Sequence, residues 1–383
     1  MKLNHNLDAL ERSGIRVFTN LARQTPNCRM LTIGEPDLPT PEPIKAAAAQ
    51  ALKDGLTHYA PNQGTEGLRR AIAAFESRRG RPTRESEVLV TIGATQALNI
   101  ALTGILNPGD EVIIPTPAFS LYDSIVKAAG GKSVFLDRTK TGFQIEEASL
   151  KKLLTPRTRA IVLNSPNNPT GVVLNRDSLS AVSAALRDTP DCLLICDNVY
   201  GALAYRQVPD LSLEPSLRNR VLLCQSFSKP YAMTGWRVGY LVAPEETLER
   251  LLLLCAAQIA AVPTFVQAAA QKALEVDTEP MRQIYAKRRA YVLSRLEGMG
   301  LSFPTPEGAF YVFPDISKYG IPSWEFCTRM IREGRLAAVP GVCFGAEGYI
   351  RLSYCYSDEE LKAGLDNMEA FLKGLSAGKG CFR

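Results

Sequence analysis

The feature that most constrains the fold is an alternation, between residues 87 and 243, of short apolar runs with helical patterns. The apolar runs, which we predict to be strands, are residues 88–92, 112–115, 133–136, 160–163, 193–196, 221–224 and 238–242. Most of them contain only apolar residues, which is typical of strands covered by helices on both faces. Helical patterns over residues 95–106, 119–129 and 177–187 lie between them. We therefore predict a doubly wound α/β domain with a mostly parallel, seven-stranded sheet and a ligand site at the carboxyl ends of its strands.

The rest of the chain predicts a second, smaller domain. Residues 280–298 form one long helical pattern, and further helices are expected over residues 323–333 and 358–372. Short strands are expected at residues 309–313, near 337 and at 349–353, and residues 11–30 and 31–33 predict a helix and then a strand. We predict a large α/β domain over residues 41–279 and a small α+β domain built from residues 1–40 and 280–383.

The composition describes a folded protein without an obvious charged partner. Hydrophobic residues make up 46% and charged residues 22% of the chain, which fits a folded protein and not a disordered one. The net charge of +5 is spread thinly over 383 residues, so no nucleic-acid partner is expected. The longest apolar run, residues 251–262, contains Gln258 and is too short to cross a membrane.

Two further features suggest a location in the cytoplasm. Residues 1–16 carry charges throughout, so no signal peptide is predicted. The nine cysteines are odd in number and scattered, and several lie in predicted strands. That pattern predicts reduced core thiols in a cytoplasmic protein instead of a disulfide framework.

The chain has only two histidines, His5 and His58. A Ser-His-Asp triad is therefore hard to build, and a histidine-rich metal site is excluded. We expect no metal, and the general base must be a lysine, a carboxylate, a tyrosine or a cysteine.

Candidate ligand-binding residues follow the predicted strands. Gly93-Ala94-Thr95 opens a helix after the first strand, where free backbone N–H groups and the helix dipole favour an anion. An ordinary capped helix is the alternative. Phe119 lies just past the next strand, where it could stack on a flat ring or serve as a plain core residue.

Polar residues end two of the central strands. Asn168 lies among prolines and further asparagines after the fourth strand, in a turn or as a donor to a ligand oxygen. Asp197 ends an apolar strand and precedes Tyr200 by three residues. A buried carboxylate needs a cationic partner, which a protonated pyridine nitrogen would provide, although a helix cap is the alternative.

The loop after the sixth strand, residues 226–237, contains a lysine between two phosphate-binding candidates. Lys229 at a strand end can lose solvation, which lowers its pKa and makes its amine a nucleophile towards carbonyls. Ser226 and Arg237 could both hold a phosphate. Schiff-base lysine, hydroxyl donor and cationic clamp together describe a pyridoxal phosphate pocket. A surface lysine beside a turn is the alternative that this loop alone leaves open.

Taken together, the motifs resemble those of the class I/II aminotransferases, the fold-type I pyridoxal phosphate enzymes related to aspartate aminotransferase. The resemblance runs from Gly34 to the end of the chain. Its motifs, in the order of the family, are Gly34-Glu35-Pro36-Asp37, Tyr59, Gly93-Ala94-Thr95, Phe119, Asn168-Pro169-Thr170-Gly171, Asp197-x-x-Tyr200, Ser226-x-x-Lys229, Arg237 and Arg351.

This resemblance implies how pyridoxal 5′-phosphate is bound. Lys229 forms the Schiff base and then moves the proton, while Asp197 pairs with the pyridine nitrogen and Phe119 stacks on the ring. Tyr200 and Asn168 bond the ring hydroxyl oxygen. The phosphate is held by Gly93, Ala94, Thr95, Ser226 and Arg237.

The resemblance also implies partners. Tyr59 reaches the phosphate of a neighbouring subunit, so a homodimer with shared active sites is expected. Arg351 binds the α-carboxylate of the substrate, and Gly34 and Asn168 join it in substrate binding. The implied reaction is a ping-pong transfer of an amino group between an L-amino acid and a 2-keto acid.

Some residues depart from the pattern of the family. Asn198 stands where relatives commonly carry an acid, and Thr95 stands where one aspartate-using branch has a lysine. Two segments, Ser13-Gly14-Ile15-Arg16 and the run from Leu31 to Asp37, are most similar to the acetyl-diaminopimelate aminotransferase branch, and the role of Arg16 stays open.

Two other functions remain open at this point. A β-eliminating C–S lyase shares the fold and cofactor pocket, and keto-acid-dependent turnover would distinguish the two. An aminotransferase-like regulatory domain without catalysis is disfavoured, since residues 1–12 leave no room for a DNA-binding domain.

Overall fold

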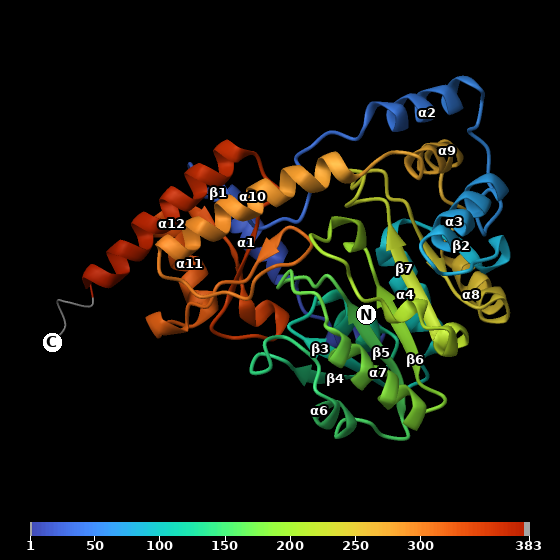
Figure 1. The fold of residues 1–383 in the computed structure, drawn as a ribbon, viewed down its shortest axis with the longest axis horizontal. Helices are drawn as coiled ribbons and strands as arrows, with labels where there is room; N and C mark the ends of the chain where they lie inside the picture. The colour runs from blue at the N-terminus through green and yellow to red at the C-terminus, as the bar shows by residue number, and fades with distance from the viewer. Residues whose placement is uncertain (1, 379–383) are drawn as a thin grey trace.

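The computed structural model describes residues 2–378, with side chains through Leu375. Figure 1 shows two lobes, a larger one built around a twisted sheet and a smaller one that contains α10, α11 and α12. The long helix α10, Glu279–Gly298, runs from one lobe into the other.

The larger lobe contains the predicted seven-stranded sheet. Its strands are β2 Val88–Thr91, β3 Glu111–Thr116, β4 Lys132–Asp137, β5 Thr158–Asn164, β6 Leu193–Asp197, β7 Val221–Ser226 and β8 Gly239–Val242. Their order is β2-β8-β7-β6-β5-β3-β4, and β8 alone runs antiparallel to its neighbours within this sheet. The prediction of a mostly parallel, doubly wound sheet is confirmed. Consecutive strands β5, β6 and β7 are neighbours, so their carboxyl ends meet at one edge.

Helices cover both faces of this sheet, and their buried side chains form two core clusters. One face packs against α2 Glu42–Lys53, α3 Glu66–Arg78, α6 Glu147–Lys151, α7 Arg176–Asp188 and α9 Thr264–Ala273. The other packs against α4 Gly93–Ile105, α5 Leu121–Ala128 and α8 Glu245–Gln258. Burial alternates along the strands as a two-residue period requires: Val88 and Val90 enter the first cluster and Leu89 enters the second.

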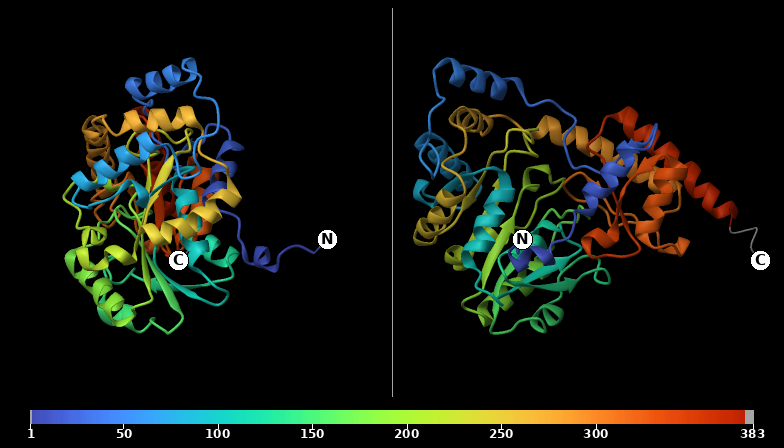
Figure 2. Two further views of the ribbon diagram at one scale, coloured as in Figure 1. Left: turned by 90° about the vertical axis from the view of Figure 1, so that its right-hand side faces the viewer. Right: turned by 180° about the vertical axis from the view of Figure 1, so that it is seen from behind.

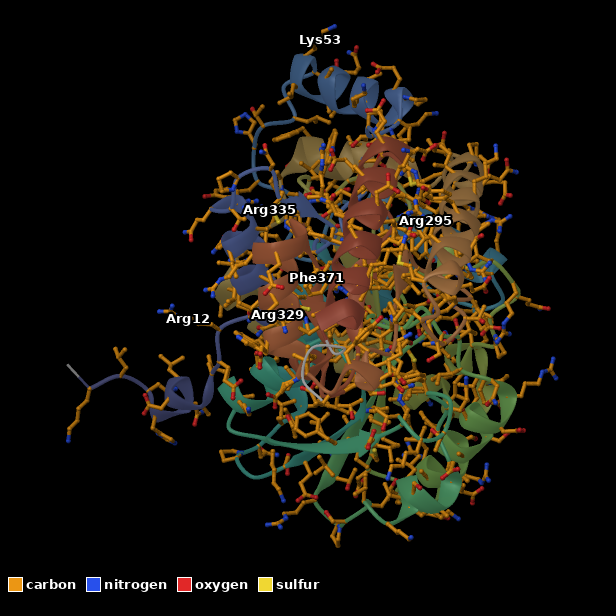
Figure 3. All side chains as sticks on the ribbon, turned by 90° about the vertical axis from the view of Figure 1, so that its left-hand side faces the viewer. Arg12, Lys53, Arg295, Arg329, Arg335 and Phe371 are labelled. Atoms are coloured by element: carbon orange, nitrogen blue, oxygen red, sulfur yellow. The ribbon has the colours of Figure 1, made fainter. Side chains whose placement is uncertain are left out.

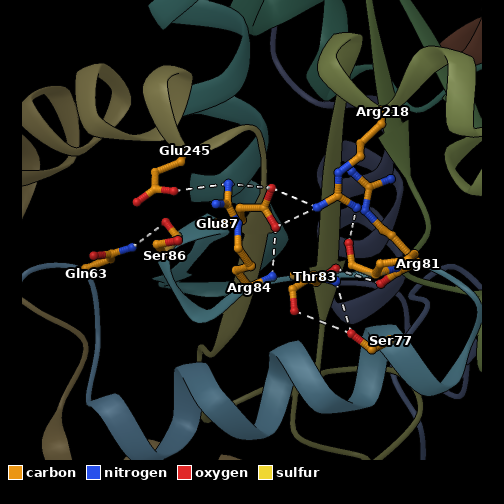
Figure 4. A network of polar contacts seen from close by, with 10 residues as sticks. Gln63, Ser77, Arg81, Thr83, Arg84, Ser86, Glu87, Arg218 and Glu245 are labelled. Atoms are coloured by element: carbon orange, nitrogen blue, oxygen red, sulfur yellow. Dashed lines mark hydrogen bonds and ion pairs between the residues drawn. The ribbon is translucent and has the colours of Figure 1, made fainter.

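A polar network holds the start of β2 against the surrounding helices (Figure 4). The buried Glu87 carboxylate accepts two hydrogen bonds from Arg218, at 2.9 and 3.0 Å, and one from the Arg84 backbone N–H. Arg84 also forms an ion pair with Glu245 at the start of α8. The network ties the edge of the sheet to the adjacent loops, far from the strand ends that carry the candidate ligand residues.

The smaller lobe contains short strands and three long helices. Its strands are β9 Tyr311–Val312, β10 Leu336–Ala337, β11 Val339–Pro340 and β12 Ile350–Ser353, and its helices α11 Ser323–Gly334 and α12 Asp358–Gly378 accompany α10. The three-stranded sheet has the order β11-β12-β9. A third cluster of buried side chains fills this lobe and includes Phe18 and Leu31 from the N-terminal segment.

Two expectations for the N-terminal segment were wrong in extent. The helix predicted over residues 11–30 is α1 Gly14–Arg23, and it ends before Pro26, which cannot continue a helix, and Asn27, which has a φ of 57°. The strand predicted at residues 31–33 is β1 Arg29–Met30, which pairs in parallel with β10. The N–H of the buried Leu31 still donates to the Ala337 carbonyl of β10, but the Ile33 N–H donates to the Tyr356 hydroxyl, so the ladder does not extend to Ile33.

Figure 2 shows the first residues projecting from the body of the chain, with the short 3₁₀ turn His5–Ala9 beside α5. Asn6 donates to the Ala128 carbonyl at the end of α5. Within residues 2–378, the helices are too short or too polar for any of them to span a membrane.

Candidate active site

A pocket of about 250 Å³ opens at the carboxyl ends of β5, β6 and β7, beside the N-terminus of α4. This is where a doubly wound sheet is expected to bind its ligand. Ten of the predicted site residues line it: Gly34, Ala94, Thr95, Phe119, Asn168, Asp197, Tyr200, Ser226, Lys229 and Arg351. They come from both lobes, so the folded chain brings together residues more than 300 positions apart.

Lys229 lies in the loop that follows β7, and its side chain is half-buried. Its Nζ donates to the Gly34 carbonyl at 2.5 Å, and burial lowers the pKa of the amine to about 8. Within the described residues Lys229 forms no ion pair with a carboxylate. The uncharged share of this amine near neutral pH is therefore far larger than for an ordinary lysine with a pKa of 10.5, and the uncharged amine is the state that attacks a carbonyl carbon.

Asp197 ends β6 and is only 5% exposed. Its Oδ2 accepts a 2.6 Å hydrogen bond from the hydroxyl of Tyr122, and its Oδ1 accepts a longer one from the Val199 N–H. Burial raises the pKa of the Asp197 carboxyl to about 6, and these hydrogen bonds oppose the rise. A cation placed beside it would favour the ionised carboxylate further.

Arg351 projects from β12 into the same pocket and is 2% exposed. Its Nη1 donates to Asn168 Oδ1 at 2.8 Å, and its Nη2 donates to the Thr32 carbonyl. Its Nε has no hydrogen-bond partner, and the guanidinium packs over the rings of Tyr311 and Phe344 at 4.5 and 5.0 Å. No carboxylate of the described chain pairs with this buried charge, so the site lacks an anion that the guanidinium favours.

Two tyrosine hydroxyls meet on the floor of the pocket. The hydroxyls of Tyr200 and Tyr311 lie 2.9 Å apart, and both rings are buried. A side chain on Gly34 would collide with the Tyr311 hydroxyl, because a Cβ there would lie 1.7 Å from it. The glycine thus allows the N-terminal segment to approach the pocket closely.

The start of α4 forms a small cradle with the loop residues after β7. Gly93 has a φ of +67°, and a Cβ there would lie 2.9 Å from Nη2 of Arg237. Ser226 is buried at the end of β7. Arg237 is exposed, and its Nη1 donates a hydrogen bond to the Thr234 carbonyl. Backbone N–H groups at a helix start, a hydroxyl and a guanidinium are the donors that a phosphate prefers.

Three predicted residues do not line the pocket. Gly93 and Arg237 lie in the cradle next to it, beside Ala94. Tyr59 is 90% exposed and lies on the loop between α2 and α3, outside the pocket of its own chain. Within residues 2–378, the acidic, histidine and cysteine side chains form no cluster that could hold a metal ion.

Two tyrosines that line the pocket were missed in the sequence. Tyr122 follows Phe119 by three positions within a predicted helix, a spacing that places two side chains on one face and could have identified it. Tyr311 gave no comparable signal, because only the docking of the smaller lobe brings β9 to the pocket.

The Tyr122 hydrogen bond predicts a measurable change at Asp197. Tyr122→Phe removes a donor that lowers the pKa of this carboxyl, so that pKa should rise above about 6. A pKa that is higher in the folded than in the unfolded protein means that the protonated carboxyl stabilises the folded state. This contribution to the free energy of unfolding is lost as pH rises through the folded-state pKa, and in the variant the loss extends to higher pH. Carbon-13 NMR titration of the Asp197 carboxyl, assigned with Asp197→Asn, measures the shift.

Tyr285→Phe is the matched control, since the buried Tyr285 hydroxyl has no hydrogen-bond partner within the described residues and belongs to the core cluster of the smaller lobe. An unchanged Asp197 titration in Tyr122→Phe, or an equal change in both variants, would contradict the assignment.

Comparison with known proteins identifies the family. Residues 26–368 match the family model of aminotransferase class I and II. The chain is 38% identical over 377 residues to the probable N-acetyl-LL-diaminopimelate aminotransferase of Bacillus subtilis (strain 168), covering 97% of this chain and 95% of that relative. It is 39% identical over 385 residues to aromatic-amino-acid aminotransferase 2 of Thermococcus litoralis, covering 97% and 99% of the two chains.

A solved structure agrees with these relatives. The aspartate aminotransferase from Thermus thermophilus, determined with maleate, superimposes with a TM-score of 0.92 at 33% identity, and the match covers 97% of this chain and 100% of that one. The predicted fold-type I architecture is confirmed, and the regulatory and lyase alternatives find no support among these relatives. The chain belongs to the class I and II aminotransferases and is a transferase of amino groups.

Proposed function

We propose that this aminotransferase binds pyridoxal 5′-phosphate in the pocket at the strand ends and exchanges an amino group between an L-amino acid and a 2-keto acid in two half-reactions. The observation that carries the proposal is that the pocket contains both an amine with a lowered pKa and a buried guanidinium without a carboxylate partner in the described chain. Lys229 and Arg351 line one pocket, and neither pairs with a carboxylate in the described chain. An α-amino acid presents an amine and a carboxylate to such a pair.

The residues present fit the cofactor. Asp197 is a buried carboxylate that forms no ion pair within the described residues, and a protonated pyridine nitrogen would provide a cationic partner. The cradle of Gly93, Ala94, Thr95, Ser226 and Arg237 would hold the phosphate. Tyr200 and Asn168 would bond the ring oxygen, and Phe119 would lie against the ring face, as the family resemblance implies.

Bound pyridoxal phosphate supplies an aldehyde that condenses with amines and a ring that accepts the electron pair released at the α-carbon of the substrate. Lys229 would perform the proton transfers: once its Nζ is free, the amine would take the proton from the α-carbon of the substrate and deliver it to the cofactor carbon that carried the aldehyde. Its pKa of about 8 keeps the amine able to do both near neutral pH. Asp197 would accept a hydrogen bond from the ring nitrogen and keep that nitrogen protonated.

Arg351 orients the substrate. The fork of its guanidinium matches a carboxylate with two parallel hydrogen bonds, and Nε offers a donor that has no partner among residues 2–378. Its present bond to Asn168 Oδ1 joins a residue of the small lobe to a loop of the large lobe. A carboxylate bound there would therefore draw the two lobes together and exclude water from the reacting atoms.

Product analysis distinguishes the proposed transaminase from a C–S lyase. A transaminase requires a keto acid for continued turnover, whereas a C–S lyase releases pyruvate and ammonia from a single thioether amino acid. Keto-acid-independent ammonia release would contradict the proposal.

We also propose the two-domain division at residues 41–279, with residues 1–40 and 280–383 in the small domain. The separate core clusters support it, since one of them is built largely from residues on either side of the large domain. A cytoplasmic location is supported by the eight described cysteines, which are all free thiols. Thiol titration of freshly purified, unfolded protein tests this point.

Arg351→Lys should raise the KM for amino acids steeply while the fold and the bound cofactor persist. Lysine keeps the charge but cannot form the bidentate pair, so the expected loss is about 2–5 kcal/mol for a desolvated contact. The measurement is stopped-flow reaction with an amino acid and with the amine that lacks its carboxylate.

Arg332→Lys, an exposed site on α11, is the control. If Arg351→Lys and the wild-type enzyme discriminate equally between the amino acid and the amine, the carboxylate anchor lies elsewhere.

We propose a homodimer with shared active sites, supported by Tyr59. An aromatic ring that is 90% exposed on a loop outside its own pocket fits a contact with a second subunit, where its hydroxyl would donate to the phosphate.

The dimer can be tested by mixing two damaged chains. In a mixed dimer of a Lys229→Ala chain and a Tyr59→Phe chain, shared sites place both lesions in one site, so the other site keeps both native residues. Random re-association should then restore about a quarter of wild-type activity. A fully active monomer, or no recovery in a mixture shown to contain mixed dimers, would contradict shared sites.

A further inference from the structure

The pair of tyrosine hydroxyls on the floor of the pocket has one hydrogen more than its single bond uses. The hydroxyls of Tyr200 and Tyr311 lie 2.9 Å apart, and either oxygen could be the donor. Within the part of the chain that the structure describes, neither hydroxyl has a further hydrogen-bond partner. Each phenol carries one hydrogen, and a buried O–H without an acceptor costs free energy. The rings are 4% and 2% exposed, so the second hydrogen is available to an oxygen acceptor in the pocket that both tyrosines line.

The two tyrosines come from opposite lobes. Tyr200 follows β6 of the larger lobe, three residues after Asp197. Tyr311 lies on β9 of the smaller lobe, and the guanidinium of Arg351 lies over its ring at 4.5 Å. Tyr200 is thus next to the residue assigned to the cofactor ring, and Tyr311 is next to the residue assigned to the substrate carboxylate. If Tyr200 donates its one hydrogen to a ligand oxygen, the pair stays bonded only when Tyr311 donates to the Tyr200 oxygen.

Contacts with several segments hold the Tyr311 ring in place. A Cβ on Gly34 would lie 1.7 Å from the Tyr311 hydroxyl, so the N-terminal segment passes directly against the phenol. On the other side β9 pairs with β12, where Tyr311 is opposite Ser353. The ring centroids of Phe310 and Tyr200 lie 5.0 and 5.7 Å from that of Tyr311, both in edge-on contacts. The hydroxyl is therefore a donor whose position is fixed before a ligand binds.

The charge of Arg351 makes Tyr311 a stronger donor. Arg295 and Arg329, which Figure 3 labels on the outer helices α10 and α11, both form ion pairs with carboxylates. Arg351 has no carboxylate partner among residues 2–378, and its charge lies over the electron-rich face of Tyr311. Burial raises the pKa of Tyr311 to about 12, and Arg351 opposes this rise. A cation beside a phenol favours release of its proton, and hence its donation in a hydrogen bond.

We propose that Tyr311 is a positioning residue whose hydroxyl donates to the Tyr200 oxygen, so that the single hydrogen of Tyr200 points to the ring oxygen of the bound cofactor. This inference rests on the proposed function of the same site. Tyr311 acts through Tyr200 and not by its own contact with the ring oxygen. Because consecutive hydrogen bonds polarise one another, a donor behind Tyr200 strengthens the bond that Tyr200 itself donates.

The test measures the pKa of the Schiff base between Lys229 and pyridoxal 5′-phosphate, from the absorbance of the bound cofactor as a function of pH. A hydrogen bond to the ring oxygen withdraws electron density from an atom that also attracts the Schiff-base proton. Weakening that hydrogen bond should therefore raise the pKa of the Schiff base. The variants are Tyr311→Phe, Tyr200→Phe and the double variant, each loaded with the cofactor and titrated without substrate.

Tyr354→Phe is the matched control. Tyr354 is also a buried tyrosine of the smaller lobe, 1% exposed, and its hydroxyl lies 3.3 Å from the hydroxyl of a second tyrosine, Tyr205. Neither of these two residues lines the pocket. Tyr354→Phe therefore removes a comparable buried hydroxyl, and thermal unfolding of both variants shows any loss of stability separately from the absorbance titration.

We expect Tyr311→Phe to raise the pKa of the Schiff base by on the order of half a pH unit, and Tyr200→Phe to raise it further. The double variant should titrate like Tyr200→Phe alone, because Tyr311 has no effect once the residue through which it acts is lost. Tyr354→Phe should leave this pKa unchanged. Replacement of Tyr311 by 3-fluorotyrosine keeps the ring and its hydroxyl but makes the hydroxyl more acidic, so the pKa of the Schiff base should fall.

The assignment would be overturned by an unchanged or lowered pKa of the Schiff base in Tyr311→Phe, or by an equal shift in Tyr354→Phe. Shifts of Tyr311→Phe and Tyr200→Phe that add in the double variant would show that Tyr311 does not act through Tyr200. If Tyr311→Phe does not fold, a 3-fluorotyrosine protein with an unchanged pKa overturns the assignment instead. Failure of the proposed function is distinct, since the wild-type enzyme would then form no Schiff base on Lys229 or would not react with any amino acid.

Discussion

The structure depends most on a buried guanidinium that the chain itself does not neutralise. Arg351 is almost fully buried, yet its partners are an amide oxygen, a backbone carbonyl and two aromatic faces. Burying a charge without a counter-ion costs free energy, so the burial of this guanidinium does not by itself stabilise the folded state. The arrangement makes physical sense when a carboxylate from outside the chain completes it.

The groups around Arg351 come from segments far apart in sequence, and separate contacts hold each segment in place. Thr32 belongs to the N-terminal segment, whose Asp37 carboxylate pairs with both Nη atoms of Arg288 at 2.6 and 2.9 Å. Arg288 also bonds Asp358 at the start of α12. This clamp on α10 fixes the segment that carries Gly34, the carbonyl partner of Lys229. The amine and the guanidinium are thus positioned by one framework.

Much of this could be predicted from the sequence, because the relevant signals are local. All seven strands of the large sheet follow from apolar runs, and Lys229, Asp197 and Asn168 stand at strand ends, where the topology gathers them. What escaped prediction depends on contacts between distant segments. Tyr311 reaches the pocket only because β9 of the smaller lobe lies against it. The pairing of the N-terminal segment with β10 ends where the Ile33 N–H donates to the Tyr356 hydroxyl and not to a backbone carbonyl. Such contacts leave no periodic pattern to detect.

The central claim, that Lys229 carries the cofactor because burial keeps its amine reactive, can be tested by trapping. The apoprotein is mixed with pyridoxal 5′-phosphate over a range of pH, reduced with borohydride, and digested for peptide mapping. The account predicts one main adduct, on Lys229, whose rate of formation rises with pH through about 8 and then levels off. An adduct mainly on another lysine, or a Lys229 adduct whose rate rises only near pH 10.5 as for an ordinary lysine, would contradict it.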